Sequence, residues 1–414
     1  MDWFTRPPTL RPHAHQQDFP PSRFAALRRA LTADPVRYAR TRNHLDGAVT
    51  ALSPYITHGL LPADELFDLW RYRLGLSVKD KLLGELAWRE FFHHVWQHRG
   101  EEILHDLGPG LPGVRYGDRL PEDIRQAATG VPVIDATVRR IYQAGWLHNH
   151  QRMWLASYVV HLRKVHWRAG ADWMYGHLLD GDLASNHLSW QWVAGTFSHK
   201  PYLFNADNVQ RYAPDLGSRG TAIDRTYAEL ETLARNAVDV GPEDRRPSPV
   251  EEPPLHDSPP DWQLSEDTPE GQDRWTAVVH PWSLEGRVPA LRQVGILHAD
   301  FHRRFPWSAR RWAFVLGRMG RICDRIYRGD LAAIATDLAP PDRLLAVMTL
   351  NPGYREGLGL AVRGCLAPPP TALPELEGCK PSYSAWLKAQ CRRNPMLCAA
   401  RHTCTGPCPP AENA

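Results

Sequence analysis

The stretch Asp180–Trp192, DGDLASNHLSWQW, combines acidic, amide and aromatic side chains. Two aspartates flank Gly181, and Asn186 and the indoles of Trp190 and Trp192 follow. Because glycine relaxes the backbone, a turn or a helix start here can direct both carboxylates at one polar ligand. The alternative is an Asx-type helix cap followed by a buried helix.

Apolar residues recur at helical spacing on both sides of this stretch, from about residue 22 to about residue 212. Runs of β-branched residues are few, and helix starts are expected at Asp80 and at Pro132–Val133. The sequence therefore predicts a mainly α fold with a helical domain over residues 23–239.

An arginine upstream is expected to pair with one of the two aspartates. Arg152 follows Asn149 by three residues, so the two side chains share a face of a helix. A buried arginine requires a carboxylate partner, and Asp180 and Asp182 are the candidates.

Two further segments carry polar groups beside apolar ones. Glu85 and Trp88 share a helical face, where the glutamate is either half of a solvated surface pair or a recessed acid with a raised pKa. Thr50 and Ser53 precede Pro54, an arrangement that suits an ordinary N-cap or a helix start whose amides hold a phosphate.

Composition bounds the class of protein. The 414 residues suffice for about two or three domains, and 43% hydrophobic with 23% charged residues excludes wholesale disorder. A net charge of +3 permits a local basic surface but does not by itself indicate a nucleic-acid binder. Tryptophan is frequent, with 16 residues against 13 tyrosines and 11 phenylalanines, so some indoles are expected to stack on ligands or carry out chemistry.

The sequence predicts neither export nor membrane insertion. No window approaches about 20 consecutive apolar residues, and residues 1–22 form a proline-rich arm without the apolar core of a signal peptide. The seven cysteines all follow residue 322, and their odd number argues against a secreted disulfide scaffold. We therefore expect a cytoplasmic protein that does not associate with membranes.

The remainder of the chain divides into a proline-rich linker over residues 240–272, expected to be solvated and poorly ordered, and a C-terminal α or α/β block over residues 273–414. RLLAVMTL (343–350) suits a buried strand or a helix. The tail contains cysteines whose spacings match no strong metal template, so we expect no metal site but thiols, reduced or adventitiously oxidised. These are Cys391, Cys398, Cys404 and Cys408, with His402 nearby.

Several segments in a fixed order resemble the FAD-binding helical domain of the DNA photolyase/cryptochrome family. The resemblance covers roughly residues 35–215, about half of the chain. Its motifs are Tyr38 with Arg42, TALSPYITHG (50–59), GELAWREFFHH (84–94), TGVPVIDATVRRIYQAGWLHNHQRM (129–153), HWRAG (166–170), DGDLASNHLSWQWVAG (180–195) and KPYLFN (200–205).

The resemblance implies that FAD is bound inside the helical domain. Asn186 matches the position that faces flavin N5, where photolyases typically carry asparagine and plant cryptochromes aspartate. Asparagine cannot protonate N5, which favours the anionic reduced flavin that repair requires. The residues matched to cofactor binding are Tyr38, Thr50, Ala51, Leu52, Ser53, Asn149, Arg152, Asp180, Gly181, Asp182 and Asn186.

The resemblance also implies an activity: repair of pyrimidine dimers in single- or double-stranded DNA, driven by blue light, by a deoxyribodipyrimidine photolyase-like carbon–carbon lyase. The alternative is a cryptochrome-like photosensor without repair activity, which signals to an unknown protein partner through the C-terminal block. Glu85, Trp88, Met153 and Trp192 match the pocket for the flipped dimer. The matched DNA contacts are Arg42, Glu85, Trp88, Arg89 and Asn149, with Arg139 and Arg140 as further candidates for phosphates.

Trp190 and Trp167 match the first two members of the family's electron-transfer chain. The third position falls on Ile124, so either Trp146, Trp154 or Trp173 substitutes or photoreduction is impaired. The family's α/β antenna domain is not expected, because only about 35 proline-rich residues precede the flavin motifs. These departures favour the photosensor or a third alternative, a degenerate FAD-binding or DNA-binding protein with little photochemistry. They leave the expectation of FAD binding unchanged.

Overall fold

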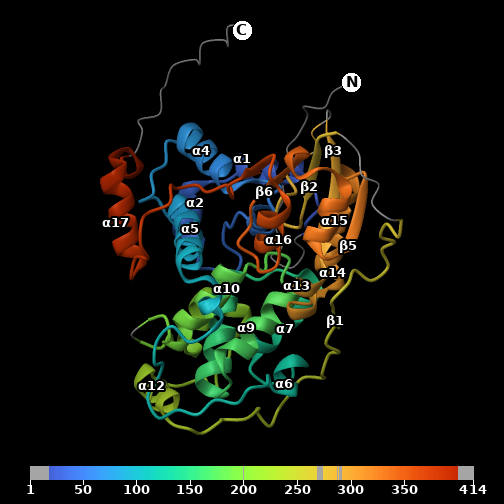
Figure 1. The fold of residues 1–414 in the computed structure, drawn as a ribbon. Helices are drawn as coiled ribbons and strands as arrows, with labels where there is room; N and C mark the ends of the chain where they lie inside the picture. Colours follow the sequence, from blue (N-terminus) through green and yellow to red (C-terminus); the bar gives the residue numbers. More distant parts are fainter. Residues whose placement is uncertain (1–17, 199, 268–273, 287, 289–290, 400–414) are drawn as a thin grey trace, which may run out of the picture.

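The computed structural model describes residues 18–198, 200–267, 274–286, 288 and 291–399 (Figure 1). The helix starts predicted at Asp80 and Pro132 are confirmed, because Asp80 is the N-cap of the fifth helix and Pro132 is the first residue of the seventh. The helices of the first part are α1 (Arg23–Leu31), α2 (Pro35–Thr41), α3 (Ser53–Thr57), α4 (Ala63–Leu74), α5 (Lys81–Arg99), α6 (Glu122–Arg125), α7 (Pro132–Ala144), α8 (Asn149–Ser157), α9 (Trp167–His177), α10 (Leu183–Ala194), α11 (Ala206–Tyr212) and α12 (Tyr227–Arg235).

The C-terminal block is an α/β unit, so its predicted fold class is confirmed. Its parallel sheet has the strand order β5-β3-β2-β6-β7, and a separate antiparallel pair joins β1 to β4. The bounds are β1 (Leu255–His256), β2 (Thr276–Val279), β3 (Arg292–His298), α13 (Ala299–Arg304), β4 (Trp307–Ser308), α14 (Ala309–Ile322), β5 (Arg325–Gly329), α15 (Leu331–Leu338), β6 (Leu344–Val347), α16 (Tyr354–Ala361), β7 (Cys365–Ala367) and α17 (Tyr383–Arg393).

Burial explains why these segments form a parallel sheet. Every residue of β3 is buried, as is usual for a central parallel strand covered on both faces. The segment that suited a strand or a helix is the strand β6, and its register pairs Leu344 with Thr276. The strand order reverses between β2 and β6, which makes the sheet doubly wound.

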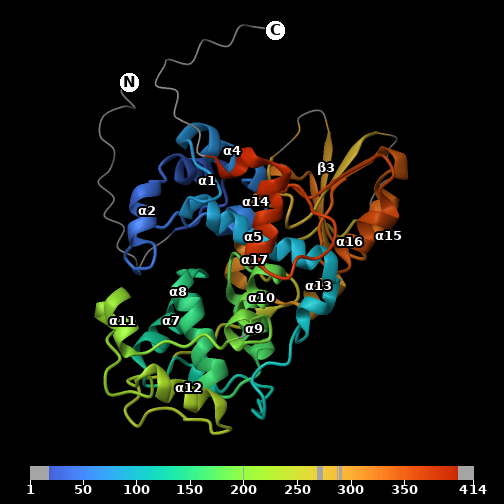
Figure 2. The same ribbon diagram turned by 90° about the vertical axis from the view of Figure 1, so that its left-hand side faces the viewer.

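The buried apolar side chains form two cores that do not coincide with the predicted domain limits. One core contains side chains of α4 and α5, such as Leu66 and Phe91, together with Ile296 of the sheet. The other contains side chains of α7 to α12, such as Val138 and Trp190. Accordingly, α6–α12 lie below α1–α5 and the sheet in both views (Figures 1 and 2). The first five helices therefore share their core with the α/β block.

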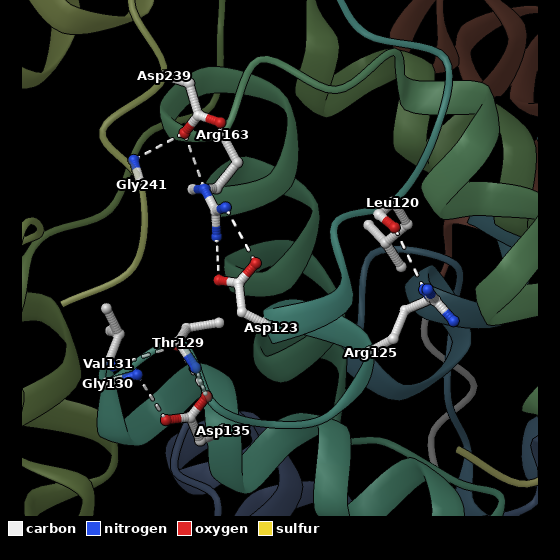
Figure 3. A network of polar contacts seen from close by, with 10 residues as sticks. All are labelled: Leu120, Asp123, Arg125, Thr129, Gly130, Val131, Asp135, Arg163, Asp239 and Gly241. Atoms are coloured by element: carbon white, nitrogen blue, oxygen red, sulfur yellow. Dashed lines mark hydrogen bonds and ion pairs between the residues drawn. The ribbon is translucent and has the colours of Figure 1, made fainter. Parts of the chain in front are cut away.

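The linker is anchored along the second core, so the expectation of poor order is wrong for residues 240–252, whose amides at Val240, Glu243 and Val250 bond to carbonyls of that core's segments. Arg163 bridges Asp123 (Nη1 to Oδ2, 2.6 Å) and Asp239 (Nε to Oδ1, 2.8 Å), and Figure 3 shows this network beside the turn that Asp135 holds. Glu252 accepts hydrogen bonds from Arg125 and from the indole of Trp173. Proline-rich composition therefore coexists here with specific polar contacts.

The C-terminal segment 372–398, which we call the strap, packs along α5. Glu90 accepts the amide of Ala372, and His94 accepts the amide of Lys380. The helix α17 within the strap lies beside α5 in both views (Figures 1 and 2) and was not predicted from the sequence.

Cys391 and Cys398 form a disulfide between α17 and the short turn Pro395–Cys398. Cys404, Cys408 and His402 lie outside the described residues. None of the helices in the described part of the chain combines the length and the apolar character needed to cross a membrane.

Candidate functional site

A cavity of about 710 Å³ opens between α2, α3, α5, α8 and α10. It brings together residues that are far apart in the sequence. Of the described residues matched to cofactor binding, to the dimer pocket and to the first two positions of the electron chain, all but Gly181 and Trp167 line it. The lining includes Tyr38, Arg42, Thr50, Ala51, Leu52, Ser53, Glu85, Trp88, Arg89, Asn149, Arg152, Met153, Asp180, Asp182, Asn186, Trp190 and Trp192.

The predicted ion pair between Arg152 and an aspartate is confirmed. Arg152 Nη2 lies 2.6 Å from Asp180 Oδ2, and the aspartate is almost completely buried. Pairing offsets the cost of removing both charges from water, and the second oxygen of Asp180 is left to the cavity.

Asp182 is both a helix cap and a charged partner. Its side chain accepts the amide of Ser185 at the start of α10, and its Oδ2 lies 2.9 Å from His93 Nε2. Burial alone would raise the pKa of Asp182, but His93, Arg89 and the bond from Ser185 hold that pKa well below its ordinary value. Asp182 is therefore ionised, and the expected Asx-type cap is present as well. His93 was not identified from the sequence.

Gly181 faces away from the cavity, toward a residue of the α/β block. A Cβ on Gly181 would lie 2.4 Å from Nη1 of Arg311, so a side chain cannot be accommodated without a shift. Arg311 is completely buried and donates to the carbonyls of Gly181 (2.6 Å) and Tyr175 (3.0 Å). Gly181 thus permits a close approach to Arg311. The sequence motifs contain no signal for this contact, because the two residues are 130 positions apart.

One buried oxygen of the cavity lining, Asp180 Oδ1, has no hydrogen-bond partner among the described residues. His148, which also lines the cavity, accepts the amide of His150 on Nδ1, so the ring's proton resides on Nε2, and the ring also bonds to the backbone of Arg42. Burial lowers the pKa of His148 to about 4, which keeps the ring neutral. An unpaired buried oxygen is costly, so Asp180 Oδ1 favours a polar ligand in the cavity.

The hydroxyl of Ser53 faces the cavity and does not cap its helix. Leu52 occupies the N-cap position of α3, and the structure has no side-chain cap there, so the ordinary N-cap is wrong. Ser53 Oγ accepts the indole N–H of Trp146 at 3.1 Å. Ala51 has φ +49°, a conformation that L-residues seldom adopt and that often marks a functional site.

The more exposed end of the cavity carries an acid and two indoles. Glu85 Oε1 lies 2.7 Å from Arg42 Nη1. Burial raises the pKa of Glu85, although the positive charges of Arg42 and Lys81 act to lower it. Trp88 stacks on Tyr383 of the strap, with ring centroids 3.9 Å apart and planes at 8°. Tyr383 was missed because it is about 300 residues from Trp88 in the sequence.

The two arginines of α7 have different surroundings. Arg139 donates to the carbonyls of Ala127 and Ser248, so it fastens the linker. Arg140 lies over the ring of Trp146, 5.7 Å from its centroid. Neither residue lines the cavity in the described structure.

The tryptophans of the expected electron chain lie on adjacent helices. Trp190 lines the cavity, whereas Trp167 lies behind it and donates its indole N–H to Asp106. Ile124 is completely buried. Of the three candidates for a third donor, Trp146 lines the cavity, and the other two bond to polar side chains of the second core, Trp154 to Asn208 and Trp173 to Glu252.

Comparison with known proteins identifies the segment around the cavity. Residues 82–254 match the FAD binding domain of DNA photolyase. The deoxyribodipyrimidine photo-lyase of Streptomyces griseus is 32% identical over 206 residues, 46% of this chain and 45% of that protein. Cryptochrome-1 of Arabidopsis thaliana is 27% identical over 225 residues, 50% of this chain and 32% of that protein. The solved cryptochrome of Synechocystis is 26% identical with a TM-score of 0.44, over 49% of this chain and 45% of that one.

The matched segment is therefore a FAD-binding domain of the photolyase type, and the resemblance stated from the sequence is confirmed for it. It includes α5, α8 and α10, whereas Tyr38 and the residues of α3 precede it. The chain spans less than half the length of the two curated relatives.

Proposed function

We propose that the protein binds FAD in this cavity and splits pyrimidine dimers in DNA with blue light, as a photolyase-like carbon–carbon lyase. One observation carries the proposal. A single cavity joins buried polar side chains at its inner end, including an oxygen of Asp180 without a partner among the described residues, with an acid and two indoles at its exposed end. The inner atoms suit a polar cofactor, and the indoles suit a base that has left its stack.

The inner residues fit the chemistry of FAD. The hydroxyls of Thr50 and Ser53 can donate to phosphate or ribityl oxygens, while the free oxygen of Asp180 can accept from a hydroxyl or an amine. When bound in its reduced form, FAD would supply, on absorbing light, the electron that splits the dimer. Asn186 donates its amide to the carbonyl of Ala171 at 2.8 Å, so its oxygen is the end left for the cofactor, and this residue has no proton to give to it.

The exposed end suits an extruded lesion. Trp192 is 37% exposed, and Trp88 is half-buried with one face on Tyr383, so the two indoles offer stacking surface. Glu85, when protonated, can donate a hydrogen bond to the dimer. Arg42 and Arg89 place positive charge beside them for DNA phosphates.

Illumination of the reduced protein with an oligonucleotide that contains a thymine dimer tests the proposal, with single- and double-stranded substrates side by side. We expect the absorbance of thymine to recover under blue light and not in the dark. Protein that contains reduced FAD and binds the oligonucleotide without any recovery would overturn repair.

A matched pair of variants tests the lesion pocket. Trp192→Ala should weaken binding of the dimer oligonucleotide by about 1–3 kcal/mol while FAD stays bound. Trp262→Ala is the control, because Trp262 is 38% exposed but lies outside the cavity. Equal effects of the two substitutions would remove Trp192 from the pocket.

The contact between the strap and α5 favours a second candidate, a photosensor that binds the same cofactor without repair. Glu90 and His94 join α5, a wall of the cavity, to the strap, so a change at the cofactor can reach a protein partner there. Light-driven reduction of the bound flavin without dimer splitting would support this candidate against the first.

A further inference from the structure

We propose that Asp106 accepts the proton that Trp167 releases when its indole is oxidised, so that the electron relay from the cavity ends at Trp167. The inference rests on the proposed function, because it takes Trp190 and Trp167 as the relay. It assigns a role to a residue outside the cavity, and it requires no third tryptophan at the position of Ile124, whose side chain is buried and cannot relay an electron.

The hydrogen bond between the two residues provides a path for the proton. Trp167 is 2% exposed, and its Nε1 donates to Asp106 Oδ1 at 2.5 Å. The side chain of Asp106 is 49% exposed, so a proton placed on this carboxylate can exchange with water. His166 Nε2 lies 3.4 Å from the same oxygen and is its second neighbour.

The position of Asp106 is fixed by the two helices that carry the tryptophans. Gln191, next to Trp190 in α10, is completely buried; its Oε1 accepts the amide of Leu107 (3.0 Å) and its Nε2 donates to the carbonyl of Ile103 (2.9 Å). Arg168, next to Trp167 in α9, donates to the carbonyl of Leu104 at 2.6 Å.

These three bonds hold the segment on both sides of Asp106. The carboxylate is therefore positioned in advance of the reaction, which is the arrangement expected of a group that transfers a proton.

Trp190 and Trp167 lie across the same contact between α9 and α10. A Cβ on Gly170 would lie 2.3 Å from the ring of Trp190, so glycine lets that indole approach the backbone of α9. One turn earlier in both helices, the rings of Trp167 and His187 are 6.2 Å apart. The two indoles are therefore displaced by about one helical turn, roughly 5 Å along the axes.

The proposed step balances in atoms and charge. Trp167 would give one electron to the oxidised indole of Trp190, and oxidised FAD, when bound and excited by light, would be the acceptor of the electron that Trp190 loses. The Nε1–H bond of Trp167 then breaks, and the proton bonds to the carboxylate of Asp106. The products are a neutral indolyl radical and a carboxylic acid, which releases the proton to water.

Neutralisation favours charge separation, because a buried indole cation without a proton acceptor is costly. Loss of the proton also slows the return of the electron to Trp167, because the indole must be protonated again. A thiol in solution completes the cycle by giving a hydrogen atom to the radical, and the thiol is oxidised.

Flash photolysis of the protein with oxidised FAD tests the step. Cation and neutral tryptophan radicals absorb differently, and we expect Asp106→Asn, which keeps a hydrogen-bond acceptor but is not a base, to slow conversion of cation to neutral radical at least about tenfold. Asp106→Glu should restore much of the rate. Glu102→Gln is the control, because Glu102 is an exposed acid of the same segment.

An unchanged rate in Asp106→Asn would overturn the proposal. A tryptophan radical that lives longer in Tyr116→Phe than in wild type would also overturn the proposal. It would show that Tyr116 normally gives an electron to the radical through His166, whose ring centroid lies 6.4 Å from that of Tyr116.

A second measurement does not depend on flavin. In protein prepared without FAD and labelled with ¹⁵N-tryptophan, the indole N–H of Trp167, assigned with Trp167→Phe, should resonate downfield and shift upfield in Asp106→Asn. If this shift is seen, but illumination of the protein that contains FAD reduces no flavin, the hydrogen bond is confirmed and the proposed electron relay is wrong. If no shift is seen, the proton path itself is wrong.

Discussion

At the residue scale, Glu85 is subject to two opposing influences. Burial raises its pKa, whereas the nearby guanidinium of Arg42 favours the charged carboxylate. If the protonated form donates to the dimer, the repair rate should be highest at low pH and fall as the pH rises through this raised pKa. A pH profile of the single-turnover repair rate measures the effect.

Two variants separate the charge from the proton. Arg42→Met removes the opposing charge, so the fall in rate should move to higher pH. Glu85→Gln should lower the rate by roughly tenfold to a hundredfold and flatten the profile, with FAD still bound. A profile that is identical in wild type and Glu85→Gln would show that another group titrates.

Asp182 provides a prediction about stability. Its pKa is lower in the folded protein than the ordinary value of about 3.9, so it stabilises the fold above that pH and loses this contribution as the pH falls toward the folded pKa. Asp182→Asn retains a side chain that can cap α10 but loses the charge paired with His93. We expect a loss of about 1–3 kcal/mol in the free energy of unfolding at pH 7.

Urea unfolding at pH 7 and at pH 3 measures this difference. The gap between wild type and Asp182→Asn should narrow at the lower pH, because the wild-type carboxylate begins to lose its advantage there. Asp64→Asn is the control, because Asp64 is an acid in the first turn of α4 and away from the cavity. A gap that widens at pH 3 would contradict the assigned charge state.

At the scale of elements, α17 supports the rim of the cavity. Tyr383 covers one face of Trp88 and donates its hydroxyl to the carbonyl of Gly84 at 3.3 Å, so it restricts the plane of the indole. Tyr383→Leu should weaken binding of the dimer oligonucleotide by about 0.5–1.5 kcal/mol, whereas Tyr383→Phe should retain nearly all of the affinity. Fluorescence titration with the oligonucleotide measures both.

The FAD content should remain unchanged in both Tyr383 variants, because Tyr383 does not line the cavity. Tyr227→Leu, which removes a ring 51% exposed on α12, is the control for general effects of a lost tyrosine. Equal losses of affinity in Tyr383→Leu and Tyr227→Leu would argue against a role for the stacked pair.

The elements differ in how well local sequence predicts them. The starts of α5 and α7 follow from Asp80 and Pro132, because caps and proline act within one turn. In α17, the buried Trp386 and Gln390 do share a face, but proline-rich segments flank the helix, and its partners on α5 lie nearly 300 residues away. Helix α17 depends on those tertiary contacts, which no local pattern contains.

The same distinction applies to the site. The pairing of Arg152 with an aspartate could be predicted, because a buried arginine requires a carboxylate and few were available. His93 and Tyr383 could not, since each acts through one side-chain contact that only the folded chain creates. The role of Asp106 could not be predicted either. In the sequence it is one acid among others, and only the contacts of Gln191 and Arg168 in the folded chain place it beside Trp167.

At the scale of the whole molecule, the α/β block helps to build the turn between Asp180 and Asp182. Arg311 of α14 reaches across the two cores, donates to the carbonyls of Gly181 and Tyr175, and lies 3.9 Å from the ring centroid of Trp307. Burial lowers the pKa of Arg311, but the guanidinium remains charged because its ordinary pKa is so high. The positive charge also favours the ionised form of Asp182 beside it.

Arg311→Met should therefore affect stability and cofactor binding together. It leaves two buried carbonyls without donors, at a cost of about 2–5 kcal/mol in the free energy of unfolding, and it frees the turn that presents Asp180 to the cavity. We expect a lower melting temperature and faster loss of FAD on dilution, measured by thermal unfolding and by flavin fluorescence. Arg311→Lys should recover only part of the lost stability and FAD retention, because one ammonium group does not reproduce the planar set of donors of a guanidinium group.

Arg321→Met is the matched control, since Arg321 lies exposed on the same helix. If Arg311→Met lowers the melting temperature but releases FAD no faster than Arg321→Met, the arginine only joins the two cores. If FAD is released faster even where both proteins are fully folded, the α/β block sets the geometry of the cofactor turn. The second result would give a functional reason for the completely buried guanidinium of Arg311, which bonds to the backbone of the turn between Asp180 and Asp182.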